Sequence, residues 1–508
     1  MWNEGYTSEI NYTSGYYSEL SPTRIRLALL SCGIEHSVPE DPDYLELGFG
    51  QGFSLNVNAA TNSGRYWGTD FNPGQVANAR QLGNAMGKPL TLLEDSFEEL
   101  AARNDLPQFD IIALHGIWSW ISLGARKAII EIARKSLKPG GALYTSYNVT
   151  PGWSPAWPLR ILLSEYAKRE GSGPILNKVE DSIQFVERVI GANAAYFMQN
   201  PQLANRLEQI KKHDRSYIAH EYFNAHWDPM PFSAVADQLA EAKLNFAASA
   251  SILDNVQAIS IPAAAIPVLQ SIKDPVMRET TRDYFANTQF RRDIFIKGGR
   301  PMAVYDLNRR IESTQFMLIG KADQCPEKIN TSVGEVALKT EMYKPVAEEL
   351  AKLPSASATV GELMAAEGTK HLNRGQIWEI MLVLTGAGLV APVSTSGTPK
   401  EDEAAAHSLN RALMDRAEAG VGVEFLAAPR LGTATTVSRI DQMLIRAMLN
   451  GEKDPAEAVR KSLESQGQYL IVEGQAVQDQ AAALKELKRI LGEFNKTRAP
   501  LLQQLGVY

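Results

Sequence analysis

Three glycines behind an acidic residue are the first group in this chain whose types and spacing could carry chemistry. Glu46 lies in a short apolar run that leads into Gly48, Gly50 and Gly52, and a helix-compatible segment follows. Glycine allows positive φ and a close approach of the backbone to a ligand, and the N-terminus of a helix attracts polar and anionic groups. Dinucleotide folds usually space their glycines G-x-G-x-x-G, whereas here they read G-x-G-x-G. The stretch predicts a nucleotide-like ligand. The spacing of its glycines differs from that of dinucleotide-binding folds and therefore helps to identify the ligand.

An acidic residue closes the next strand-like run. Asp70 lies 18 residues after Gly52, where a carboxylate can accept hydrogen bonds from the hydroxyls of a ribose. The alternative role for Asp70 is the N-cap of a helix that begins near Pro73, a common position for aspartate. We favour ribose binding for Asp70 and include the adjacent Phe71 among the cofactor-binding candidates.

A histidine and two tryptophans follow the fourth strand-like run, in the order His115, Trp118 and Trp120. Ligands of open α/β sheets bind beyond the carboxyl ends of the strands, so His115 is expected near the reacting group. Histidine is the side chain best suited to exchange protons near neutrality. The alternative, a histidine that hydrogen-bonds a loop and orders the pocket, is nearly as well supported. Each tryptophan could line the ligand slot or belong to the core.

The elements that must position these residues alternate between strands and helices. Strand-like runs are expected at residues 44–48, 66–71, 90–94, 109–115 and 142–149. Helix-compatible stretches lie between them, near residues 53–61, 74–86, 97–103 and 122–136. This alternation predicts an α/β, Rossmann-like domain with a parallel sheet built by right-handed crossovers. The turn at residues 138–141 should deliver the fifth strand.

The rest of the chain suggests an insertion and two further regions. Residues 151–240 have a helical pattern, and residues 244–254 and 293–297 resemble two more strands. The expected organisation is a Rossmann-like core with a tyrosine-rich arm, a helical insertion, the last strands of the sheet, a regulatory region and a mostly helical C-terminal region. The corresponding boundaries are 1–150, 151–240, 241–300, 301–395 and 396–508. Three helix candidates followed by a glycine turn and a strand suggest a winged-helix-like module near residues 334–393, and a plain helical regulatory or packing domain is at least as well supported.

Bulk properties limit the classes of partner and compartment. The net charge of −7 and the pI of about 5.7 give no support for nucleic acid as a partner. Cys32 and Cys325 are the only cysteines, too few for a disulfide framework or a structural zinc site. The spacing of His213, His220 and His226 does not suit a helical metal site, so no metal is expected. Neither a signal peptide nor an apolar run of transmembrane length is evident, which predicts a cytoplasmic protein without membrane insertion.

The motifs together resemble a known family. The tyrosine-rich segment 6–22, the E-x-G-x-G-x-G motif of Glu46–Gly52 and especially the run from His115 to Trp120 are similar to bacterial class I S-adenosylmethionine (AdoMet) methyltransferases with a methyltransferase regulatory domain. Residues 284–296 resemble the tail of that domain. Its best-known members are rickettsial protein lysine methyltransferases that modify outer-membrane surface proteins.

The resemblance implies a fold, a cofactor and further site residues. It implies a seven-stranded sheet with an antiparallel last strand, AdoMet as methyl donor, S-adenosylhomocysteine (AdoHcy) as product, and no metal. Asp95, at the end of the third strand, would hold the adenine amino group, with Ser96 as a second candidate or as the cap of the next helix. Trp118 joins the cofactor-binding candidates. A protein substrate, methylated before its export to the outer membrane or surface, and a homodimer are also implied.

Aromatic and hydroxyl side chains suit methyl transfer to an amine, because rings attract the sulfonium and the ammonium product. Tyr6, Tyr12, Tyr16 and Tyr17 on the N-terminal arm could form such a wall, or could dock the arm as surface tyrosines. Tyr147, at the end of the fifth strand, is a further pocket candidate. We assign Tyr12, Tyr16, Tyr147 and His115 to catalysis. Tyr6 and His115 are also assigned to cofactor binding.

The resemblance makes protein lysine N-methylation the first hypothesis for function. A lysine has a pKa of about 10.4, so the site must desolvate it or accept its proton before the neutral amine attacks in line. Two alternatives stay open: a small-molecule N- or O-methyltransferase with the helical insertion as lid, and a non-catalytic AdoMet-binding regulator.

Overall fold

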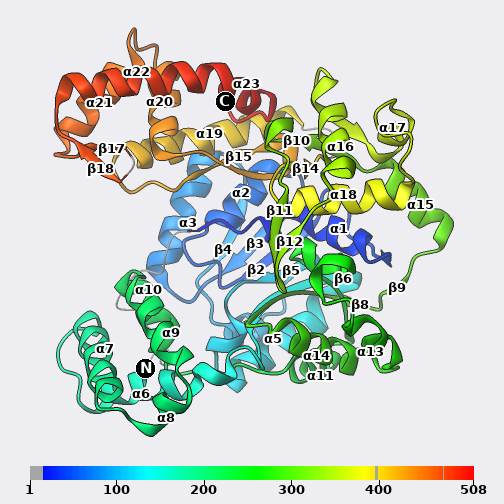
Figure 1. Ribbon diagram of the computed structural model, residues 1–508, viewed down its shortest axis with the longest axis vertical. Helices are drawn as coiled ribbons and strands as arrows, with labels where there is room; N and C mark the ends of the chain where they lie inside the picture. The colour runs from blue at the N-terminus through cyan, green and yellow to red at the C-terminus, as the bar shows by residue number, and fades with distance from the viewer. Residues whose placement is uncertain (1–14, 395–398, 473) are drawn as a thin grey trace.

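A seven-stranded sheet forms the centre of the molecule (Figure 1) and positions the expected site. The computed structural model describes residues 15–394, 399–472 and 474–508. The strand order is β4-β3-β2-β5-β6-β8-β7, parallel except for β8, which runs antiparallel to both neighbours. The strands are β2 (Asp43–Leu47), β3 (Arg65–Thr69), β4 (Leu90–Leu93), β5 (Phe109–Leu114), β6 (Leu137–Asn148), β7 (Leu244–Ser249) and β8 (Phe290–Lys297). The Rossmann-like class I methyltransferase fold, with its antiparallel last strand, is confirmed.

The fifth strand differs from its expected bounds. β6 begins at Leu137 rather than near residue 142, because Leu137 pairs with Phe109. The pairing then shifts in register between Phe109 and Ile111, and Gly140 takes a φ of 74°. The expected turn is therefore an irregularity inside a longer strand.

The crossover helices begin where local sequence signals place them. They are α2 (Phe53–Thr61), α3 (Pro73–Met86), α4 (Phe97–Ala102) and α5 (Leu123–Ser136). Asn72 caps α3 by accepting a hydrogen bond from the Gly74 amide, with Pro73 at the first helical position. Ser96 and Glu99 form a reciprocal capping box at the start of α4. The carboxyl ends of the strands therefore lead directly into helix N-termini.

A helical lobe follows β6 and lies apart from the sheet in Figure 1. It contains α6 (Trp157–Arg169), α7 (Ile175–Gly191), α8 (Ala195–Gln199), α9 (Gln202–Lys211) and α10 (Arg215–Tyr222). The lobe has a hydrophobic cluster of its own, which includes Leu163, Ile183 and Leu207. α11 (Phe232–Ala240) then leads back to β7, and α12 (Gln257–Ser260), α13 (Ala265–Ser271) and α14 (Pro275–Ala286) connect β7 to β8.

Residues 304–392 combine helices with a small antiparallel sheet. Strands β10 (Gln315–Leu318), β13 (Ser357–Thr359) and β14 (Val390–Pro392) have the order β13-β10-β14. They are accompanied by α15 (Val304–Ser313), the hairpin of β11 (Lys328–Thr331) and β12 (Gly334–Ala337), α16 (Thr340–Lys352), α17 (Val360–Ala365) and α18 (Arg374–Gly386). α16, α17 and α18 correspond to the three expected helices. The winged-helix-like character of this region stays a prediction.

The C-terminal region is mostly helical and packs against the sheet domain. It contains α19 (Lys400–Glu418), α20 (Arg439–Leu449), α21 (Pro455–Ser465), α22 (Gln480–Thr497), α23 (Ala499–Gln504) and the hairpins β15 (Phe425–Ala428)–β16 (Thr433–Thr436) and β17 (Leu470–Val472)–β18 (Gln475–Val477). α19 lies against α2 and α3. Lys88 and Asp402 form an ion pair of 2.7 Å across this contact.

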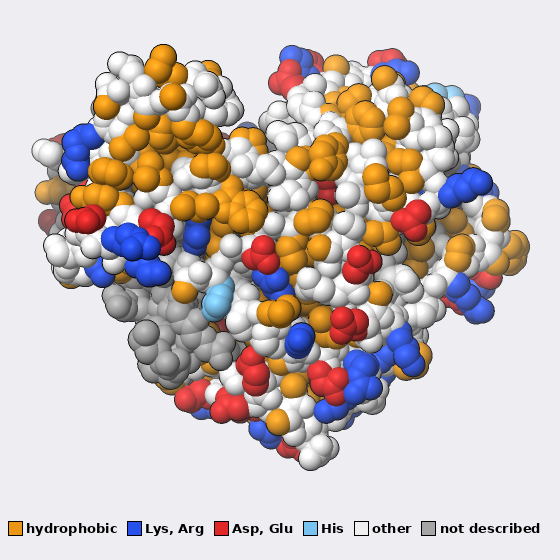
Figure 2. Space-filling view, turned by 90° about the horizontal axis from the view of Figure 1, so that it is seen from below, with side chains coloured by type: hydrophobic (Ala, Val, Ile, Leu, Met, Phe, Trp, Pro, Cys, Tyr) orange, Lys and Arg blue, Asp and Glu red, His pale blue; other side chains and the backbone are white. Residues whose placement is uncertain are grey.

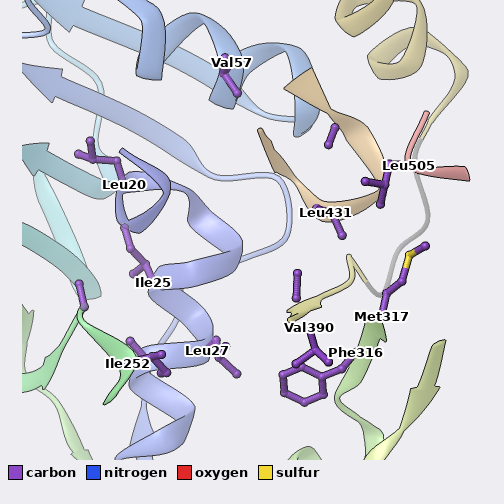
Figure 3. Packing of buried hydrophobic residues seen from close by; sticks show 14 of the residues in the cluster. Leu20, Ile25, Leu27, Val57, Ile252, Phe316, Met317, Val390, Leu431 and Leu505 are labelled. Carbon is purple, nitrogen blue, oxygen red and sulfur yellow. The ribbon is translucent and has the colours of Figure 1, made fainter. Parts of the chain in front are cut away.

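One hydrophobic cluster joins these regions. Figure 3 shows Ile25 and Leu27 of α1 (Pro22–Ser31) in the same packed region as Phe316 of β10, Val390 of β14 and Leu505 near the C-terminus. Because all of them are nearly inaccessible to solvent, the sheet domain and the C-terminal regions share a core. On the face shown in Figure 2, acidic and basic side chains are interspersed.

Among the described residues, no helix combines the length and the apolar character that a membrane span requires.

Candidate active site

The glycine turn after β2 has a backbone that only glycine adopts readily. Gly48, Gly50 and Gly52 have φ values of 67°, 57° and 76°. A Cβ on Gly52 would lie 2.4 Å from the Cβ of Ala79, so the turn also needs glycine for the packing of α2 on α3. The turn therefore forms a cradle of backbone at the N-terminus of α2.

Asp70 lies just beyond β3 and faces this turn. Its Oδ2 accepts a hydrogen bond of 2.9 Å from the Gly50 amide, and its Oδ1 accepts one of 2.9 Å from the Asn72 amide. Burial raises the pKa of Asp70 to about 6, against the lowering effect of these two bonds. The N-cap of α3 is Asn72, so the alternative role considered for Asp70, that of a helix cap, is wrong.

Glu46 is the acidic residue at the floor of the turn. It is 4% exposed, and its buried Oε2 has no hydrogen-bond partner among the described residues. Burial first, and the nearby charge of Asp70 second, raise the pKa of Glu46 to about 8. A buried acceptor without a donor fits a site that receives a donor from a ligand, such as the ammonium of a bound amino acid.

A cavity joins these residues to the ends of the other strands. Its empty volume is about 1430 Å³, open solvent included. The expected cofactor-binding residues that line it are Glu46, Gly48, Gly50, Gly52, Asp70, Phe71, Asp95, Ser96 and His115. Asp95 also accepts a hydrogen bond of 3.0 Å from Arg103, and Ser96 caps α4. Their roles toward a ligand stay predictions, but the fold brings all nine to one place.

His115 lies between aromatic rings at one end of this cavity. Its Nδ1 is 2.7 Å from the Tyr144 hydroxyl, and its ring stacks on Tyr17 with a centroid distance of 3.8 Å. Burial, and to a lesser degree the charge of Arg292, lowers the pKa of His115 to about 3. This low pKa makes the His115 ring a weak base at physiological pH, which favours the pocket-ordering role over that of a proton acceptor.

Three expected site residues lie away from the cavity. Trp118 is buried in the core on the α5 side of the sheet, and Trp120 lines the cavity instead. Tyr147 is fully buried and donates a hydrogen bond of 2.6 Å to Asp293. Tyr16 packs on Phe425 and hydrogen-bonds Thr433, both in the C-terminal region. These side chains have structural contacts where cofactor or substrate contacts were expected.

Two further candidates, Tyr6 and Tyr12, lie outside the described residues. In the described part of the arm, the tyrosine that lines the cavity is Tyr17, whose amide also donates a hydrogen bond of 3.1 Å to Ser54 of α2.

The lining also includes residues that the strand pattern did not indicate. His220, Glu221 and Asn224 belong to α10 and the turn after it, and His226 follows. These residues lie more than 100 positions after His115 in the sequence, and they carry no motif that would have marked them as site residues.

Glu46 makes the stability of the ligand-free protein depend on pH. Its folded pKa of about 8 lies above the ordinary glutamate value of 4.5, so the folded state binds more protons than the unfolded state between these values. Its contribution to stability is therefore lost as pH rises from about 4.5 to 8. We expect Glu46→Gln to flatten this decline in thermal melts at pH 5 to 8. The exposed Glu208→Gln is the control, and an unchanged pH dependence in Glu46→Gln would contradict the burial of a protonated Glu46.

Comparisons with known proteins agree with this geometry. A family model described as "Methyltransferase domain" matches residues 45–141, and one described as "Predicted methyltransferase regulatory domain" matches residues 214–297. The uncharacterized protein sll1526 of Synechocystis sp. is 38% identical over 509 residues, which cover 100% of this chain and 99% of that protein. The chain belongs to the methyltransferases that carry this regulatory domain. It is a class I, AdoMet-dependent methyltransferase.

The methyltransferase is also similar to rickettsial proteins. The structure of PKMT2 from Rickettsia typhi in complex with AdoHcy superposes with a TM-score of 0.69 at 18% identity, over 95% of this chain and 97% of that one. The uncharacterized protein RP789 of Rickettsia prowazekii is 21% identical over 66% of this chain and 64% of its own length. At 18% identity the likeness to PKMT2 concerns the fold, and it extends through the helical lobe and the C-terminal regions.

The cradle fits the methyl donor of this class. Glycine backbone, the carboxyl of Asp70 and the unpaired acceptor of Glu46 match the nucleoside and the ammonium of AdoMet, which supplies an electrophilic methyl group on a sulfonium when bound. Among the described residues, no three His, Cys, Asp or Glu side chains converge as a metal site would require.

Proposed function

We propose that this methyltransferase transfers methyl groups to lysine side chains of a protein. The observation that carries the proposal is that the likeness to PKMT2 covers 95% of this chain and 97% of that one, so the shared fold is not confined to the seven-stranded sheet. Enzymes that share only a cofactor need to share only the sheet domain. A common arrangement of the lobe and the C-terminal regions supports a common class of acceptor.

The walls of the cavity support an amine as the acceptor. Tyr17, His115 and Trp120 line it, and aromatic faces stabilise the sulfonium and the methylated ammonium. His115 holds Tyr17 by stacking and Tyr144 by a hydrogen bond. These contacts order one wall, so that an amine can be held in line with the methyl group while water is excluded.

The helical lobe supports a protein as the substrate. It exposes large apolar side chains, which are Trp157, Ile161, Leu176, Tyr196 and Met198. Exposed apolar surface of this kind commonly contacts other proteins. A protein bound beside the lobe could extend a lysine into the cavity.

Label transfer tests the proposal. The full chain is incubated with methyl-labelled AdoMet and a bacterial lysate, and the label in macromolecules is compared with that in small molecules. We expect the label in protein. Label only in small molecules would contradict the proposal and support the lid-type small-molecule enzyme, whereas no label in either fraction would support the non-catalytic regulator.

A further inference from the structure

The regulatory domain places a carboxylate in the cavity. Glu221 lies in the last turn of α10 and lines the cavity together with His220. Within residues 15–394, 399–472 and 474–508, no cation forms an ion pair with Glu221 and no group hydrogen-bonds its side chain. Burial raises the pKa of Glu221 to about 7. Burying a carboxylate without a partner lowers the stability of the fold. Such groups are found mainly at functional sites.

Glu221 lines the cavity close to Tyr17 and His115. Its charge raises the pKa of Tyr17, after burial and Glu19, and Tyr17 stacks on His115 beyond the end of β5. The other buried carboxylates of the cavity, Glu46 and Asp70, lie at the glycine turn, where Asp70 is bonded to Gly50. Buried acidic side chains therefore lie in two parts of the cavity. Glu46 and Asp70 lie at the glycine turn, and Glu221 lies beside Tyr17, where it could bind an acceptor.

Two of the neighbours of Glu221 are poor proton acceptors. The titratable and charged groups around it are Tyr17, Arg206, Tyr217, Tyr222, His115, His220, His226 and Arg292. His115 has its pKa lowered to about 3, and burial raises the pKa of Tyr217 to about 12. At neutral pH His115 binds protons too weakly, and Tyr217 does not ionise.

We propose that Glu221 is a catalytic residue that binds the ammonium of the acceptor and takes its proton before methyl transfer. This inference rests on the proposed amine acceptor. The N–H bond of the ammonium breaks and an O–H bond forms on Glu221. The lone pair of the neutral amine then forms the N–C bond as the C–S bond of the donor breaks, with its electrons staying on sulfur. The proton on Glu221 leaves to solvent when the product departs.

Ligand binding tests the proposal without any knowledge of the natural substrate. Sinefungin carries an amine in place of the methyl-bearing sulfonium of AdoMet, so its amine points to the acceptor end, whereas AdoHcy has no such group. In calorimetry at pH 7.5 with the full chain, we expect Glu221→Gln to weaken sinefungin at least tenfold and AdoHcy less than twofold. Equal changes for both ligands, or no change for either, would overturn the proposal.

A matched variant separates the carboxylate from the placement of its helix. Glu180 of α7 pairs with Arg215 at the start of α10 at 3.0 Å and does not line the cavity. Glu180→Gln should leave the ratio of the two affinities unchanged, and a shift like that of Glu221→Gln would assign the effect to helix placement. Glu221→Asp should recover part of the sinefungin affinity, and a loss equal to that of Glu221→Gln would also count against the proposal.

The two proposals fail in different ways. If wild-type enzyme places no label on protein, the proposed function is wrong, and the sinefungin measurement still decides the role of Glu221. If label enters protein but Glu221→Gln turns over at the wild-type rate across pH 6 to 9, the proposed function stands and the role of Glu221 is wrong.

Discussion

Asp70→Ala is expected to weaken AdoMet binding by more than tenfold, a loss of at least about 1.4 kcal/mol. The substitution removes the carboxylate that we propose accepts hydrogen bonds from the ribose hydroxyls, and it also leaves the Gly50 amide without its 2.9 Å acceptor. Both effects act on the same turn. Isothermal calorimetry with the full chain measures the change.

Asp70→Asn is the matched variant for this prediction. It keeps the size and one acceptor oxygen, so the bond from Gly50 can persist while the second ribose contact is lost. We expect an intermediate affinity. If Asp70→Ala binds AdoMet as tightly as wild type, Asp70 orders the turn and does not contact the cofactor.

Arg291→Met is expected to destabilise the protein by about 3–5 kcal/mol. Arg291, on β8, is 7% exposed and forms ion pairs with Asp293 at 2.7 Å, Asp283 at 2.8 Å and Glu279 at 3.1 Å. The Tyr147 hydroxyl bonds the same Asp293. Removing the cation leaves buried carboxylates without compensation at the junction of β6, β8 and α14. Denaturant unfolding of the full chain measures the loss.

Arg300→Met is the control for the buried network. Arg300 pairs with Glu35 at 2.5 Å, but its side chain is 76% exposed, so water screens the pair. We expect no measurable change in the unfolding midpoint of Arg300→Met. Equal destabilisation by the two substitutions would show that the buried network contributes no more to the free energy of unfolding than an exposed ion pair does.

Much of the sheet domain could be predicted from the sequence because its signals are local. Short apolar runs separated by helices define a parallel sheet, and Pro73 and Ser96 mark helix starts within a residue of those observed. The cofactor residues follow from the same pattern, because the carboxyl ends of parallel strands share one edge. Asp70 and His115 therefore reach one cavity without any knowledge of long-range packing.

The remaining part of the site depends on contacts that local patterns do not contain. Tyr16 and Tyr17 are adjacent in the sequence, and their side chains go to different surroundings: Tyr16 packs on Phe425, whereas Tyr17 enters the cavity. Trp118 and Trp120 divide between core and cavity in the same way. Only the fold reveals which member of each pair is accessible.

Glu221 shows the same limit at longer range. It lies on a helix in the insertion, and the sequence alone predicts that an isolated glutamate there is exposed to solvent. Its place in the cavity depends on how α10 returns toward the ends of the strands, which the periodicity of α10 does not encode.

Hydrolysis of labelled protein to amino acids tests the central claim most directly. Protein labelled by the full chain with methyl-labelled AdoMet is hydrolysed completely, and the amino acids are separated and identified by mass. We predict that the label is recovered in N-methylated lysine. Recovery in methylated arginine or histidine, or as methanol from carboxyl esters, with none in lysine, would contradict protein lysine methylation.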